Sequence, residues 1–133
     1  MSTKSHIETA KVLIKKANDD LLALNTLVKN SEISEESLGF HAQQVIEKSI
    51  KSVLALKSIK YPFTHDLLEL KRICDQHQIQ VPPSFSIDFD LTPFAKEYRY
   101  ESYGYEQEEP LDIVRTVRIA EDLLAWAKKT VGV

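Results

Sequence analysis

The chain has 133 residues, which is enough for one domain with a hydrophobic core and too few for two domains of ordinary size. Its composition, 43% hydrophobic and 28% charged with a formal net charge of −3, is typical of soluble globular proteins and excludes a general electrostatic affinity for nucleic acid. The single cysteine excludes an intramolecular disulfide and a thiolate metal site within one chain.

The sequence shows no membrane, cofactor or metal signature. No stretch approaches the roughly 18 consecutive apolar residues that span a bilayer, and the first residues lack the apolar core of a signal peptide. There is no glycine-rich phosphate loop and no set of metal ligands at characteristic spacing. We therefore expect a single cytoplasmic domain over residues 1–133 that needs no cofactor and no metal.

In the first segment, apolar residues recur at alternating three- and four-residue steps, which predicts a helix with one buried stripe over about six turns. The stripe consists of Ile7, Ala10, Ile14, Ala17, Leu21, Leu24 and Val28. We expect a solvated face at the residues that lie off it, Lys15, Lys16, Asn18, Asp19 and Asp20. Residues 29–36 read as a loop in which Ser34 is the N-cap of the next helix.

The second predicted helix, centred on residues 40–56, is strongly amphipathic. Its mainly apolar half is formed by Leu38, Ala42, Val45, Ile46, Ser49, Ile50, Val53, Leu54 and Leu56. The other half carries His41, Gln44, Glu47, Lys48 and Lys51. The simplest interpretation of this half is a solvated surface with an ordinary ion pair between Glu47 and Lys51. We expect the helix to end near residues 57–58, because Pro62 disfavours helical geometry at the residue before it.

A third helix is predicted to start at Thr64 as its N-cap and to run to about residue 77, with Asp66 in its first turn. It carries Leu67, Leu68, Leu70, Ile73 and Cys74, and a buried, unreactive thiol is expected for the cysteine. The position of His65 and Asp66 at the start of this helix gives both residues a structural role. The alternative is that they form a ligand or catalytic pair. Residues 78–90 are predicted to form a loop fixed by two prolines and tethered by Phe85, Ile87 and Phe89.

A shorter helix is predicted from Thr92, an N-cap followed by Pro93 at the first helical position. The last helix begins at Pro110 and repeats the rhythm of the first, at Ile113, Val117, Ala120, Leu124, Ala127 and Val131. The fold class predicted from these elements is all-α, an up-and-down bundle of four long helices plus a shorter fourth-in-sequence helix.

Arg99 and the tyrosines around it form the candidate site. A guanidinium can bind two phosphate oxygens, and tyrosine rings offer stacking surfaces worth roughly 1 to 3 kcal/mol per base. Arg99, Tyr100 and Tyr103 are the predicted contacts to nucleotide or RNA, with Lys48 and Lys51 adding positive charge to the same groove. The structural alternative is that the tyrosines cover the end of the bundle while Arg99 satisfies a helix C-terminus.

Two parts of the chain together resemble a known family. One part is the second predicted helix, with Phe40, Gln43, Gln44, Glu47, Lys48 and Lys51, and the other is the stretch after it, with Tyr61-Pro62 and Thr64-His65-Asp66-Leu67. In this order they resemble the HEPN family (higher eukaryotes and prokaryotes nucleotide-binding domain). The resemblance covers nearly the whole chain. It implies binding of a nucleotide or RNA, a homodimer with an isologous interface, and a partner of the nucleotidyltransferase type. The unusually broad apolar half of the second predicted helix, together with Trp126 and several tyrosines, is a further reason to expect the homodimer.

The sequence departs from the ribonuclease members of that family. Those members carry an arginine followed four to six residues later by a histidine, whereas here Arg99 is followed by Tyr105 and no histidine occurs after His77. An unperturbed tyrosine, with a pKa of about 10, is a poor acid-base catalyst at neutral pH. We therefore expect no or very weak RNA cleavage. Two alternative functions remain. One is a toxin ribonuclease with an altered site that uses Arg99 and Tyr105, and the other is a purely structural helical dimer.

Overall fold

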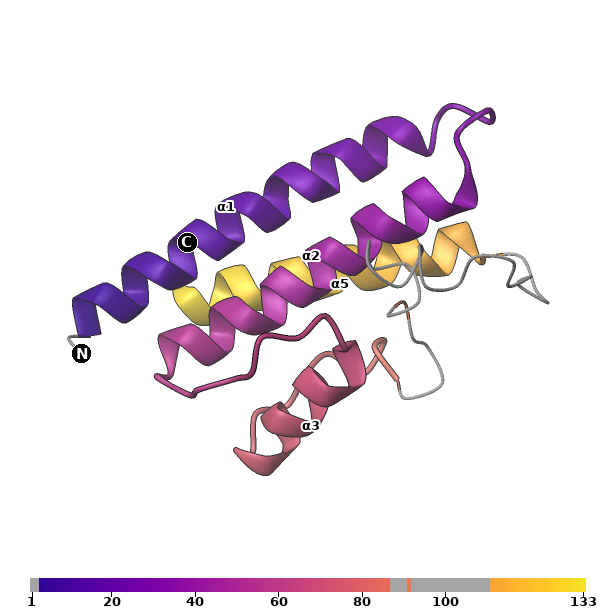
Figure 1. Ribbon diagram of the computed structural model, residues 1–133. Coiled ribbons are helices and arrows are strands. Elements are labelled where there is room, and N and C mark those ends of the chain that lie inside the picture. The colour runs from indigo at the N-terminus through magenta and orange to yellow at the C-terminus, as the bar shows by residue number, and fades with distance from the viewer. Residues whose placement is uncertain (1–2, 87–90, 92–110) are drawn as a thin grey trace.

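The second helix is the central element of the fold, because the other described helices all pack against it. The computed structural model describes residues 3–86, 91 and 111–133 (Figure 1). Its helices are α1 (Thr3–Leu27), α2 (Glu35–Leu56), α3 (Leu67–Gln76) and α5 (Ile113–Val131). All regular elements in these residues are helical, so the prediction of an all-α helical bundle is confirmed. None of the described helices is long and apolar enough to cross a membrane.

The predicted apolar stripes form the core. On α1, Ala10, Ile14, Ala17 and Leu24 of the predicted stripe are buried. On α5, three members of the predicted stripe are buried, Ala120, Leu124 and Ala127, together with Ile119 and Leu123, which the prediction left out. The apolar half of α2 is covered by the other helices of the same chain, with Val45, Ile46, Ile50, Val53 and Leu54 fully buried. Its breadth therefore offers no independent argument for a dimer.

Local cap chemistry sets the ends of the helices as predicted at α2. The Ser34 side chain accepts a hydrogen bond from the backbone N–H of Ser37 at 3.2 Å, and α2 ends at Leu56 with Lys57 as C-cap. Asp112 lies at the N-cap of α5, where Oδ1 accepts from the N–H of Arg115 at 3.1 Å. A carboxylate here satisfies a free backbone donor and also opposes the helix dipole.

The prediction that Thr64 caps the third helix is wrong. The N-cap is Asp66, whose Oδ1 accepts from the backbone N–H groups of Leu68 and Glu69 at 3.0 and 3.2 Å. Thr64 Oγ1 accepts instead from the N–H of Asp66 itself at 3.0 Å, which steadies the turn before the helix. A charged acceptor at the positive end of the helix dipole forms a stronger cap than a hydroxyl, and Asp66 lies directly before the first helical residue.

The segment of residues 57–66 doubles back along α2 before α3 begins (Figure 1). It brings His65 beside Gln43 and Glu47. These two residues lie about 13 to 20 Å along the helix axis from Leu56, where α2 ends, at about 1.5 Å per residue. After α3, Val81 and Phe85 are buried in the core, which confirms the tether predicted at Phe85. Ile87, Phe89, Arg99 and the helix predicted from Thr92 lie outside the described residues.

Candidate functional site

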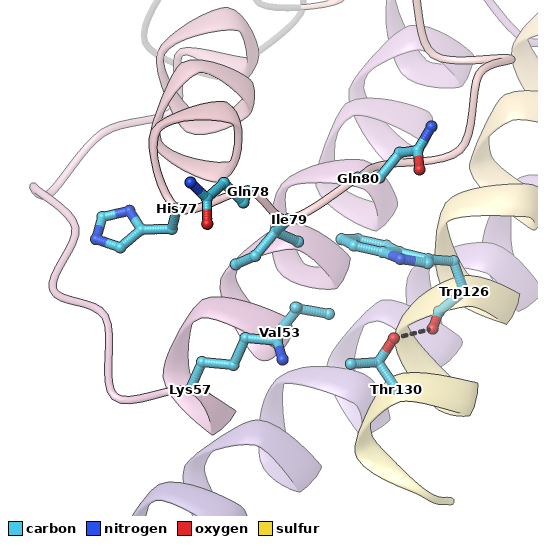
Figure 2. A pocket seen from close by; sticks show the side chains of 8 residues that line it. All are labelled: Val53, Lys57, His77, Gln78, Ile79, Gln80, Trp126 and Thr130. Atoms are coloured by element: carbon cyan, nitrogen blue, oxygen red, sulfur yellow. Dashed lines mark hydrogen bonds between the residues drawn. The ribbon is translucent and has the colours of Figure 1, made fainter.

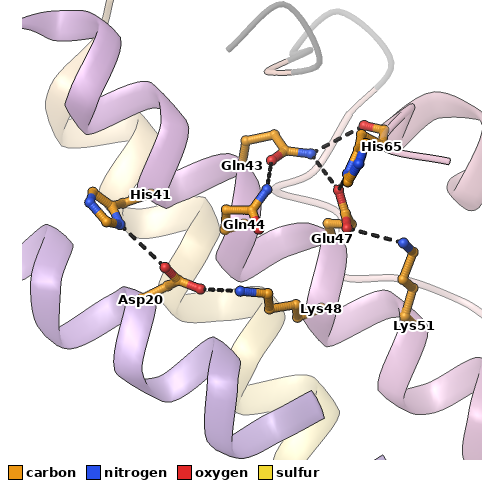
Figure 3. Close-up of polar contacts among 8 residues, drawn as sticks. All are labelled: Asp20, His41, Gln43, Gln44, Glu47, Lys48, Lys51 and His65. Atoms are coloured by element: carbon orange, nitrogen blue, oxygen red, sulfur yellow. Dashed lines mark hydrogen bonds and ion pairs between the residues drawn. The ribbon is translucent and has the colours of Figure 1, made fainter. Parts of the chain in front are cut away.

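A buried carboxylate, Glu47, lies at the centre of the polar side of α2. Only 4% of Glu47 is exposed and Gln43 is fully buried, so the solvated surface expected for this side is wrong at its centre. Glu47 Oε1 accepts from Gln43 Nε2 at 2.8 Å and lies 2.7 Å from His65 Nδ1, while Oε2 accepts from Lys51 Nζ at 3.0 Å (Figure 3). A carboxylate oxygen only accepts, which places a proton on His65 Nδ1. We call these four residues the Glu47 cluster.

The helix period of α2 and the segment of residues 57–66, which we call the returning segment, bring the four residues of the Glu47 cluster together. Gln43, Glu47 and Lys51 are spaced by four residues, so they share one face of α2. Gln43 Nε2 also donates to the backbone carbonyl of His65 at 3.1 Å, and its Oε1 accepts from Gln44 Nε2 at 2.5 Å. The Gln43 amide thereby ties the returning segment to α2. A buried charge is tolerated only when it is paired and hydrogen-bonded in this manner.

Two aromatic residues of the returning segment extend the cluster toward the surface. Lys51 Nζ lies 5.7 Å from the centroid of the Tyr61 ring, within the range of a cation–π contact. Partial burial, and secondly the negative charge of Glu47, raise the pKa of Tyr61. Phe63 is 96% exposed, and its ring meets that of His65 edge to face at a centroid distance of 5.7 Å. The cluster therefore ends at an aromatic ring that is open to solvent.

A second ion-paired group, centred on Asp20, joins α1 to α2. Asp20 Oδ2 accepts from Lys48 Nζ at 2.6 Å, and Oδ1 lies 3.2 Å from His41 Nδ1 (Figure 3). The Asp20 side chain is only 16% exposed, so the solvated face expected on α1 is wrong at this residue. The positive charge of Lys48 is thus balanced by a carboxylate of the neighbouring helix.

The predicted site residues are only partly within the described structure. Lys48 and Lys51 are both ion-paired, Lys48 with α1 and Lys51 within the Glu47 cluster. Arg99, Tyr100, Tyr103 and Tyr105 lie outside the described residues, so the groove that would join them to the lysines stays a prediction. His65 and Asp66 do not act as a pair, because Asp66 caps α3 while His65 contacts Glu47.

Sequence reasoning missed the role of Gln43 and the exposure of Phe63. The four-residue spacing of Gln43, Glu47 and Lys51 was the available signal for a shared face. Burial of that face depends on the returning segment, which no local pattern indicates. Among the described residues, no group of three or more histidine, cysteine, aspartate or glutamate side chains could hold a metal ion.

The comparison with protein families adds a decisive observation. The family model described as HEPN domain matches residues 10–130. The chain belongs to the HEPN family. Comparison with curated proteins and with solved structures gives no match. The matched range of this HEPN domain contains both the Glu47 cluster and the Asp20 group, and it also contains Arg99 with its tyrosines.

Proposed function

We propose that this HEPN domain binds a nucleotide or single-stranded RNA without cutting it, as a homodimer that works with a nucleotidyltransferase-type partner. The match to the HEPN domain over residues 10–130 carries the proposal, since the family is one of nucleotide-binding and ribonuclease-type domains. The exposed Phe63 ring beside His65 supports it. A solvent-open aromatic ring can stack on any base, and such stacking is worth roughly 1 to 3 kcal/mol.

Arg99 is the proposed anchor of the binding groove, with Tyr100 and Tyr103 as stacking residues. The lysines are the weaker part of this groove because their charges are already balanced, Lys48 by Asp20 and Lys51 by Glu47. A charge in an ion pair adds little to the field that attracts a phosphate. Arg99 combines a permanent charge with a fork that matches two phosphate oxygens, which a lysine does not reproduce.

Titration of fluorescently labelled single-stranded RNA tests the groove. We expect Arg99→Ala to weaken binding by about tenfold or more, as for loss of a charged hydrogen bond, and Arg99→Lys to weaken it nearly as much. Lys48→Gln should have a smaller effect because Lys48 is already paired. RNA binding that Arg99→Ala leaves unchanged would assign Arg99 to the structural end of the bundle.

The proposals of a homodimer and of a nucleotidyltransferase-type partner are supported by the family and not by the packing of the core. The exposed apolar side chains Val12, Leu22 and Val114 are available for a contact between copies. Light scattering at tens of micromolar is expected to give the mass of a dimer, and a monomer mass would contradict it. A reading frame for a small nucleotidyltransferase next to this one would support the pairing.

A toxin ribonuclease with an altered site is the second candidate, and one observation favours it. His65 Nδ1 lies 2.7 Å from the Glu47 carboxylate, the arrangement that orients the imidazole of a general base in hydrolases. An RNA degradation assay separates the two candidates. We expect no cleavage above background. Cleavage that survives purification and is lost in both His65→Asn and Arg99→Ala would establish the ribonuclease instead.

A further inference from the structure

The helix α5 has one face that no described part of the chain covers. It packs against α2 and α1, and its exposed residues form a single stripe along the side away from them. They are Val114, Arg118, Glu121, Ala125 and Lys129, at steps of four, three, four and four residues. At 100° per residue these positions share an arc of about 80°. Alternating steps of three and four residues are the spacing of a seam between two helices.

Trp126 is not part of this stripe, although it directly follows Ala125. Its side chain points toward Val53 and Ile79 of the same chain, where it lines a pocket of about 310 Å³ (Figure 2). The tryptophan that suggested a contact between copies is thus half-buried within its own chain. The face that α5 presents to another molecule is therefore the stripe, which we call the outward stripe of α5.

The outward stripe matches a second copy of itself in the antiparallel orientation. Arg118 and Glu121 lie equally far from the midpoint between residues 119 and 120, and Val114 and Ala125 are likewise equidistant from it. A two-fold axis through that midpoint places Arg118 of one copy opposite the partner's Glu121, and Val114 opposite the partner's Ala125. The contact then consists of two Arg–Glu pairs with an apolar contact at either end.

The order of charges along α5 suits this pairing and does not serve the helix itself. Arg115 and Arg118 lie in the N-terminal half, and Glu121 and Asp122 follow them. Within one helix the more favourable order has the carboxylate before the basic residue. No ion pair joins Arg118 to Glu121 or to another described residue. In an antiparallel pair each half of α5 faces the half of opposite charge, whereas a parallel pair brings like charges together.

The outward face of α1 is a weaker candidate for the same kind of contact. It also carries opposite charges, Lys15 and Asp19, between two exposed apolar residues. Matching these across a two-fold axis would bring the exposed Lys16 of the two copies within about 3 Å of each other along the helix axis, and like charges so placed repel. On α5 the flanking positions hold Arg115 and Asp122, which are opposite in charge.

We propose that two copies of this chain associate through the outward stripe of α5, antiparallel and about a two-fold axis between residues 119 and 120. The inference rests on the homodimer of the proposed function and assigns its interface. The seam from Val114 to Ala125 is about 17 Å long, so the contact is smaller than a standard protein interface. A dissociation constant in the micromolar range is therefore expected.

Charge reversal tests which residues meet. Arg118→Glu should raise the dissociation constant of the dimer at least about tenfold in sedimentation experiments, because four carboxylates then meet at the axis. Glu121→Arg should have the same effect, and the double variant Arg118→Glu/Glu121→Arg should restore the dimer because it exchanges the two signs. Lys15→Glu, on the outward face of α1, is the matched control and should leave the dissociation constant unchanged. All three positions are exposed, so circular dichroism should show an unchanged helix content.

Disulfide trapping locates the axis independently. Val114→Cys mixed with Ala125→Cys should give a covalent dimer under mild oxidation, because these two positions face each other across the axis. Val114→Cys alone should not, because its two copies lie about 17 Å apart, beyond the roughly 7 Å between Cα atoms that a disulfide can span. The native Cys74 is buried and should not react in either experiment.

The outcomes separate this inference from the proposed function. A wild-type chain that stays monomeric at tens of micromolar would contradict both the homodimer and this interface. A dimer that Arg118→Glu leaves intact, or that Lys15→Glu weakens as much, would overturn the α5 interface alone, and the homodimer would form through another surface. Failure of the double variant to restore the dimer, or a covalent dimer from Val114→Cys alone, would overturn the antiparallel arrangement.

Discussion

The substitution Glu47→Gln should destabilise the fold far more than loss of an ordinary surface charge. It keeps the shape of the side chain but removes the charge that balances Lys51, and the two side chains are only 5% and 11% exposed. At 3.0 Å, an effective dielectric constant of about 20 gives an attraction of roughly 5 kcal/mol. The remaining exposure of Lys51 and the Tyr61 ring offset part of the loss. We expect a decrease of about 2 to 4 kcal/mol in the free energy of unfolding.

The double variant Glu47→Gln/Lys51→Met should recover most of this loss. Removing both charges of a buried pair leaves no unbalanced ammonium, and a methionine can occupy the stem of the lysine beside Tyr61. The coupling energy between the two substitutions is therefore expected to be about 2 kcal/mol. A surface pair would show a coupling of only about 0.5 kcal/mol.

Urea unfolding followed by circular dichroism measures these differences as shifts of the midpoint at constant slope. Asp75→Asn is the matched control, because the Lys71–Asp75 pair has the same four-residue spacing on a helix but lies at 3.5 Å with Asp75 59% exposed. We expect the control to change stability by about 0.5 kcal/mol or less. The reasoning is refuted if Glu47→Gln costs no more than Asp75→Asn, or if the two substitutions of the double variant are simply additive.

Three further predictions concern single side chains. Ser49→Ala should raise the free energy of unfolding by about 0.5 to 1.5 kcal/mol in urea titrations, because the fully buried Ser49 hydroxyl has no hydrogen-bond partner within the described structure. Ser52→Ala is the control and should not raise it, because the Ser52 hydroxyl donates a 2.7 Å hydrogen bond to Ser49 O that the substitution removes. Ser34→Ala should lower stability by about 1 kcal/mol through loss of the α2 cap, and no change in the urea midpoint would contradict this. Burial raises the pKa of the Cys74 thiol from 9.0 to about 11, so the folded state favours the neutral thiol and its stabilising effect is lost as the pH rises from 9.0 toward 11. The decrease in the free energy of unfolding caused by Cys74→Ala should therefore become smaller by roughly 2 kcal/mol over that pH range, and a decrease that does not depend on pH would refute the prediction. Thiol reagents should modify the native protein slowly at pH 8.

The helices of the bundle could be predicted because their signals are local. The apolar periodicity of α1, α2 and α5 is a property of neighbouring residues, and each of these helices turns the face that the periodicity indicated toward the core, although on α5 that face also includes Ile119 and Leu123. Ser34 at the start of α2 follows from the same kind of short-range hydrogen bonding. At α3 two acceptors, Thr64 and Asp66, lie close to the start of the helix. The charged Asp66 is the N-cap in place of the expected Thr64 because it directly precedes the first helical residue.

The polar side of α2 could not be predicted, because its environment depends on parts of the chain far away in sequence. Glu47 and Lys51 have the spacing of an ordinary surface pair, and only the return of residues 57–66 along α2 brings His65 against them and excludes water. Asp20 likewise has the pattern of a solvated residue until α1 packs against α2 and places it beside Lys48. Periodicity determined which face of each helix is apolar. Whether a polar face meets water or another segment was decided by tertiary packing alone, since burial of a charge requires partners that the local sequence does not contain.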